Sequence, residues 1–160
     1  MVKVTVKSKD RSAGLSGLLR DIARKQVLVG IPEGKAPRKK GEISNAQLMY
    51  IHTHGSPLKN IPERPVIEPA IEARGNKEPI ANELKEAAQA ILNGKPQEAD
   101  RRLKRAGMLG QNAARAWFTD PRNGWPPNAP STVKSKGSEK PLIDTGQMRK
   151  SITYVVKEND

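Results

Sequence analysis

The chain has 160 residues, only five of them aromatic, no cysteine and a formal net charge of +12. This length suits a single domain, here residues 1–160, and the lack of cysteine excludes disulfides, thiolate metal sites and cysteine nucleophiles. No apolar run is long enough to cross a bilayer, and no signal peptide is expected. Because so few large apolar side chains give a modest core, we expect assembly with copies or partners.

The charge is spread unevenly along the chain. Residues 1–40 carry eleven Lys/Arg against three Asp/Glu, residues 41–100 six against nine, and residues 101–160 twelve against five. The basic ends predict a surface that faces a polyanion, such as nucleic acid. The alternative is that they give solubility and pair with an acidic partner subunit. The sequence contains no recognisable element for reading a DNA groove.

The first part of the chain predicts a strand, a helix and a second strand. Valines alternate with polar residues over 2–7, which is typical of a half-buried strand. Leucines and an isoleucine then fall on one helical face over 15–22, behind a possible cap at Ser12. Residues 27–31 form an apolar run that predicts the second strand and ends at Pro32. A loop follows over 33–41, and it is either simply solvated or contacts a phosphate backbone.

Ser44 is expected to cap a short helix over 45–53 that ends at Gly55. His52 and His54 lie in it two residues apart, a spacing that does not place them on one helical face as metal ligands. The dipole at the helix end would favour their cationic forms. Four prolines then follow within residues 57–69 and predict a rigid, extended connector.

Two helices are expected next, over about 80–91 and 97–118, and together they predict an αα-hairpin. The stripe on the second helix is made mostly of small residues, so another backbone can approach it closely. Its members are Ala99, Leu103, Ala106, Gly110, Ala113 and Trp117. The opposite face carries Arg101, Arg102, Lys104, Arg105 and Arg115.

Residues 120–140 show no hydrophobic periodicity and are expected to form a long loop. Trp125 indicates that part of this loop is pinned, and it could anchor on a neighbouring subunit.

The stretch Leu142-Ile143-Asp144-Thr145-Gly146 has the form of an aspartic-protease loop. Too few residues follow it for the strands of such a barrel, and the sequence before it is largely helical. We therefore interpret it as a tight turn in which Gly146 takes a positive φ, followed by one helical turn and a strand over 151–157. Gly146→Val should then impair folding or assembly, and Asp144→Asn should be mild.

The order of motifs resembles the neck or tail-completion proteins of long-tailed bacteriophages, also described as virion-morphogenesis or minor tail proteins. The motifs lie at Tyr50–Gly55, Ile61–Ala70, Trp125–Lys136 and Pro141–Ile152. The chain departs from the family at Thr53 and His54, where an acidic residue and an aromatic are common, and at Val66, where an aromatic is common.

The resemblance implies a non-enzymatic virion protein at the head–tail junction, assembled in the cytoplasm of the bacterial host, without a cofactor. It implies a ring of identical subunits through which DNA passes, bound to the connector, the tail terminator or the tail tube. The alternative is a basic, non-specific DNA-binding protein of a phage or prophage.

Residue roles follow from this expectation together with the charge pattern. Predicted DNA-facing residues are Arg38, Lys39, Lys40, Arg101, Arg102 and Arg105. Predicted interface residues are Trp125, Pro126, Arg64 and Pro65. Asp144, Thr145 and Gly146 form the structural turn. The expected fold class is α+β, a small antiparallel sheet packed against several helices.

Overall fold

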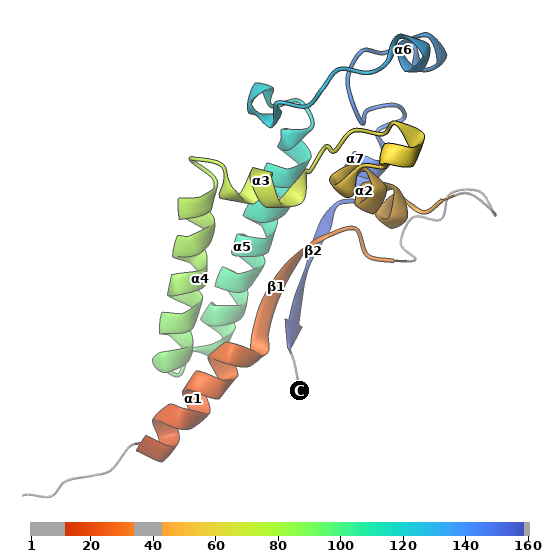
Figure 1. The fold of residues 1–160 in the computed structure, drawn as a ribbon. Coiled ribbons are helices and arrows are strands. Elements are labelled where there is room, and N and C mark those ends of the chain that lie inside the picture. The colour runs from red at the N-terminus through yellow and green to blue at the C-terminus, as the bar shows by residue number, and fades with distance from the viewer. Residues whose placement is uncertain (1–11, 34–42, 159–160) are drawn as a thin grey trace, which may run out of the picture.

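The computed structural model describes residues 12–33 and 43–158. These form an α+β fold in which a two-stranded antiparallel sheet packs against helices, as predicted (Figure 1). The predicted strand at 2–7 and the basic residues Arg38, Lys39 and Lys40 lie outside this part of the chain. The longer elements are α1 (Ser12–Arg24), β1 (Lys25–Gly30), α2 (Asn45–His54), α4 (Lys77–Leu92), α5 (Pro96–Trp117) and β2 (Thr153–Glu158). The shorter ones are α3 (Ile67–Glu72), α6 (Pro130–Lys136), α7 (Gln147–Ser151) and two 3-10 turns at Pro57–Lys59 and Pro121–Asn123.

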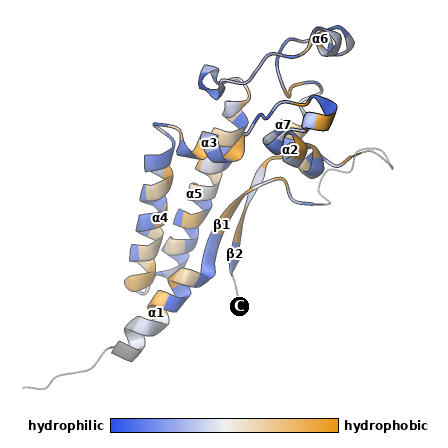
Figure 2. Cartoon of the chain, in the orientation of Figure 1, coloured by the Kyte–Doolittle hydropathy of each residue, from blue (hydrophilic) through white to orange (hydrophobic). Residues whose placement is uncertain are grey.

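The predicted αα-hairpin is present, and α4 and α5 pack along each other (Figure 1). Hydrophobic and hydrophilic residues are mixed along both helices (Figure 2). At the closed end of the hairpin, Ala90, Ile91 and Ala99 form a small core against which α1 packs Leu18 and Ile22. Small side chains bury little apolar area, so this contact contributes modest stability.

The sheet lies against α5 because that helix carries glycines where the strands cross it. Strands β1 and β2 pair so that Val29 lies opposite Tyr154. A Cβ on Gly107 would lie 2.3 Å from the Tyr154 ring, and a Cβ on Gly110 would lie 2.9 Å from Val29. The small-residue stripe therefore contacts the sheet through Gly110 as well as α4 through Ala99, and Gly107 beside the stripe adds a second contact with the sheet. Ala114, rather than the predicted Ala113, is the buried alanine near the end of the stripe.

The larger core joins α2, α3, α7 and the end of α5. Its buried members are Met49, Val66, Ala70, Ala114, Trp117, Phe118, Met148 and Ile152. Arg115 ties α5 to α7 and to the residue before β2, since its guanidinium donates to the carbonyl oxygens of Ile152 and Lys150 at 2.6–3.0 Å. Helix α7 and the start of β2 are thus held against α5 by both apolar packing and hydrogen bonds.

Two segments are more regular than the sequence predicted. Pro69 lies in the first turn of α3, where a helix does not need the N–H that proline lacks, so the expected extended connector becomes helical from Ile67. The expected loop at 120–140 contains α6, which begins at Pro130 and ends at Gly137 with φ +69°. Helix α6 has one large apolar residue, Val133, and therefore shows no amphipathic pattern.

Candidate functional site

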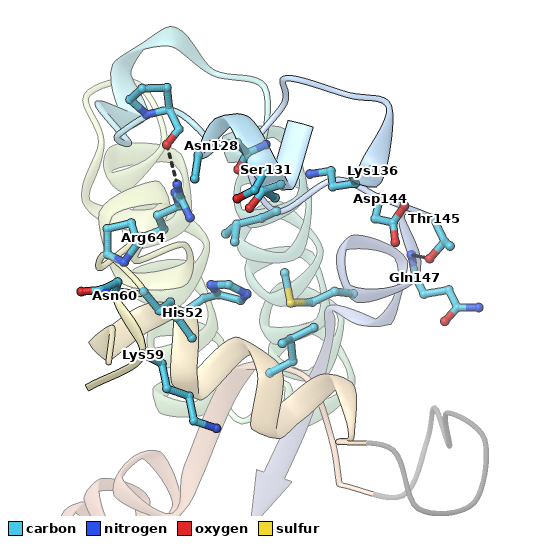
Figure 3. Close-up of a pocket in the computed structure, with 18 of the residues that line it drawn as sticks. His52, Lys59, Asn60, Arg64, Asn128, Ser131, Lys136, Asp144, Thr145 and Gln147 are labelled. Atoms are coloured by element: carbon cyan, nitrogen blue, oxygen red, sulfur yellow. Dashed lines mark hydrogen bonds between the residues drawn. The ribbon is translucent and has the colours of Figure 1, made fainter. Parts of the chain in front are cut away.

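The four motif segments meet around one groove of about 1030 Å³ at the end of the molecule where α2, α6 and α7 lie (Figures 1 and 3). From α2 and the proline segment it is lined by Leu48, His52, Pro57, Lys59, Asn60, Ile61, Pro62 and Arg64. From the α6 region and the turn before α7 it is lined by Pro127, Asn128, Ala129, Ser131, Thr132, Lys136 and 142–148 except Ile143. Segments up to 100 residues apart in sequence therefore form one surface.

Helix α2 is placed by strong local signals. Ser44 Oγ accepts a hydrogen bond from Gln47 N at 3.1 Å, and Gln47 Oε1 accepts one from Ser44 N at 3.0 Å, so the predicted cap is a complete capping box. Gly55 ends the helix with φ +68°. Asn45 Nδ2 donates to Ser151 Oγ at 2.9 Å, which links α2 to α7.

Arg64 joins the proline segment to the region before α6. Its side chain is only 6% exposed. Nε and Nη2 donate to Pro126 O at 3.2 and 2.9 Å, and Nη2 also donates to Pro127 O at 3.0 Å. Its backbone N–H donates to His52 O at 2.6 Å. A planar guanidinium can bind two neighbouring carbonyls in this way, which an ammonium group cannot reproduce.

Trp125 makes a second link between the same two segments. Its Nε1 donates to Pro65 O at 3.1 Å, and its ring meets Phe118 edge-on at 5.9 Å between centroids. The indole is pinned as predicted, but on its own chain. Trp125, Pro126, Arg64 and Pro65, predicted at an interface, thus contact one another within the subunit. Their role between subunits stays a prediction.

The predicted turn forms the far wall of the groove. Gly146 has φ +73°, as expected, and α7 begins directly after it. Thr145 Oγ1 accepts a long hydrogen bond of 3.4 Å from Gln147 N. Leu142, also in the wall, has φ +56°, a conformation that costs a non-glycine residue about 1 kcal/mol. Asp144 is exposed and is the one carboxylate among the described lining residues.

Positive groups outnumber negative ones among the described residues that line the groove. His52, Lys59, Arg64 and Lys136 line it together with Asp144 (Figure 3). Burial lowers the pKa of His52, of Arg64 and of Lys136. Repulsion from Arg64 lowers the pKa of His52 and Lys136 further, whereas attraction to Asp144 raises the pKa of Lys136 in part. His52 Nδ1 is buried and has no hydrogen-bond partner within the described chain. Desolvation therefore outweighs the helix dipole that was expected to favour a cationic His52.

The predicted DNA-facing arginines on α5 do not form one free basic face. Arg102 and Arg105 each form an ion pair of 3.2 Å with Glu83 on α4. Arg101 and Lys104 are exposed and make no ion pair with the described residues. Two of the three predicted arginines thus link α5 to α4. The sequence could not reveal these ion pairs, because Glu83 lies in another helix.

Comparison with protein-family models, with curated proteins and with solved structures finds no match. The resemblance to phage neck proteins therefore stays a prediction from the sequence motifs. In the described parts of the chain, no helix has the length and apolar character needed to span a bilayer. Residues 12–33 and 43–158 also contain no group of three or more His, Cys, Asp or Glu side chains that could hold a metal ion.

Proposed function

We propose that the protein is a structural component of the head–tail junction of a long-tailed phage, where identical subunits form a ring around the passing DNA. The observation that carries this proposal is the convergence of the four family-like motifs on one groove. The motifs are scattered over residues 50–152, and the Arg64 and Trp125 hydrogen bonds hold two of them together. Motifs that build one surface are expected if that surface binds a neighbour in an assembly.

The exposed apolar side chains support the same proposal. Leu58, at the tip of the 3-10 turn beside the groove, is 99% exposed, and Tyr50 on α2 is 66% exposed. On the outer face of the sheet Leu28 and Val155 lie opposite each other and are 50% and 44% exposed. Scattered exposed residues are ordinary, but an apolar residue as fully exposed as Leu58 is expected to be covered in an assembly.

Native mass spectrometry of the purified protein over a range of concentrations, with electron microscopy of the same samples, tests this function. A closed ring of identical subunits is the expected result, either alone or on addition of a tail-tube protein. A protein that stays monomeric under both conditions would contradict the proposal.

The second candidate, a non-specific DNA-binding protein, is favoured by the net charge of +12 and by the exposed Arg101 and Lys104. Under this function the monomer itself binds duplex DNA, and the logarithm of its affinity falls steeply with the logarithm of the salt concentration. Fluorescence anisotropy with a labelled duplex separates the two: tight binding by a protein that never forms rings favours the second candidate.

A further inference from the structure

We propose that the groove is a docking site for an extended, acidic segment of a partner protein, with a carboxylate of that segment bound between Arg64 and Lys136. This inference rests on the proposed function for the existence of a partner, and it deepens that function by naming the chemistry of what the groove binds.

The charge of the groove is unbalanced. Among the described lining residues, the charged or titratable groups that face it are His52 from α2, Lys59 and Arg64 from the proline segment, Lys136 from α6 and Asp144 from the turn. Within this part of the chain three permanent cations thus stand against one carboxylate. Asp144 attracts Lys136 electrostatically but forms no ion pair within 4.0 Å with a described residue. Like charges gathered in a partly desolvated space repel one another, and an incoming anion relieves that repulsion.

The hydrogen-bond donors of Arg64 and Lys136 are already held in place. Nε and Nη2 of Arg64 are bound to backbone carbonyls, which fixes the guanidinium plane and leaves Nη1 outside those three hydrogen bonds. Lys136 Nζ donates to Lys140 O at 2.7 Å, and an ammonium group has two further protons to donate. A carboxylate that binds here does not have to order either side chain, so less affinity is lost to entropy.

Part of the groove lining is apolar. Leu48, Ile61, Leu142 and Met148 line the same groove as the cations. Its volume of about 1030 Å³ lies at the upper end of the range for small-molecule pockets, which suits several residues of an extended peptide. Acidic residues that alternate with apolar ones would satisfy both parts of the lining, because successive side chains of an extended segment point to opposite sides.

A nucleic acid fits these features less well. Sites for single strands combine cations with aromatic side chains on which the bases stack. The described residues that line the groove include no Phe, Tyr or Trp, and Arg64 is buried rather than presented on an open face. We therefore favour a protein segment, and a nucleic-acid ligand is one of the outcomes that the test can return.

Fluorescence anisotropy on the full-length protein tests the inference with a labelled peptide of about ten residues that alternates Glu and Val. The competitors are the same peptide with Gln in place of Glu and an oligothymidylate of equal length. Lys136→Gln is the test variant. Lys134→Gln is the matched control, because Lys134 lies on the same helix, is exposed and does not line the groove.

Loss of one charge-assisted hydrogen bond predicts that Lys136→Gln weakens binding of the acidic peptide about tenfold, whereas Lys134→Gln changes it less than about twofold. Asp144→Asn removes the opposing charge and should tighten binding about threefold. Equal effects of the two lysine variants would overturn the inference, as would equal binding of the Gln peptide. More effective competition by oligothymidylate than by unlabelled acidic peptide would also overturn it, in favour of a nucleic-acid site.

The ring assay on the same preparations separates this inference from the proposed function. Binding that depends on Lys136 in a protein that forms no ring would support the groove's ligand chemistry and overturn the neck function. If the protein forms a ring but its binding of the acidic peptide does not depend on Lys136, the neck function is supported and the docking site is overturned.

Discussion

Gly107→Ala is expected to destabilise this protein, although the same change stabilises most exposed helices. Gly107 lies in the middle of α5 and faces Tyr154 of β2. A Cβ there would lie 2.3 Å from Tyr154 Cδ2 and 2.6 Å from its Cγ, whereas ordinary contact begins at 3.4 Å. Because Cγ is bonded directly to the Cβ of Tyr154, the ring cannot move away unless the rotamer or the strand changes.

Two opposing effects set the size of the change. Replacing glycine by alanine inside a helix contributes about 1 kcal/mol of stability. Overpacking a well-packed contact costs about 1–3 kcal/mol, and an overlap of about 1 Å with a ring favours the upper end of that range. We therefore expect a net loss of about 2 kcal/mol in the free energy of unfolding, which lowers the Tm by about 4–8 °C for a chain of this size.

Urea and thermal unfolding followed by circular dichroism measure this loss. Gly17→Ala is the matched control, because no atom lies within 4 Å of the Cβ it would add to α1, and it should stabilise the protein slightly. In a Tyr154→Ala background the clash is gone, so Gly107→Ala should no longer destabilise. An increase in stability on adding Gly107→Ala to the otherwise unchanged protein would refute the close approach of helix and strand.

Three further changes test other parts of the molecule. Gly146→Val should lower the free energy of unfolding by about 1–2 kcal/mol through its φ of +73° alone, since no atom lies within 4 Å of the added Cβ; unchanged urea unfolding would contradict this. Arg64→Lys should cost about 2 kcal/mol, because the ammonium group cannot bind both Pro126 O and Pro127 O, and limited proteolysis should then cut near residues 126–128 sooner than in the unchanged protein. Because the folded pKa of His52 is lowered below its ordinary 6.5, the unfolded chain takes up a proton first as the pH falls below 6.5, and stability decreases there. His52→Gln should weaken that decrease in urea unfolding measured from pH 7 to 5, and an unchanged pH dependence would contradict a desolvated His52.

Local sequence signals predicted the elements whose stability is decided within a few residues. Helix α2 begins after Ser44 and ends at Gly55 as expected, since an N-terminal cap needs only a side-chain oxygen and a nearby N–H. Gly146 allowed the turn before α7 to be predicted, because few residues other than glycine adopt its φ readily. Helix α6 was not predicted, because the prediction relied on hydrophobic periodicity, which this segment lacks. Pro130 at its start and Gly137 at its end are local signals that could have identified it.

The tertiary structure decided which distant groups meet. The sequence predicted a rigid proline segment around Arg64 and a pinned tryptophan, but the acceptors of Arg64 and Trp125 are backbone carbonyls about 60 residues away. Every residue carries such a carbonyl, so no side-chain pattern identifies the partner. The same holds for Arg102 and Arg105, whose charge was evident from the sequence and whose pairing with Glu83 depends on how two helices pack. Composition and local chemistry thus fixed the fold class and the turn, whereas the groove exists only because long-range packing brings four separate segments together.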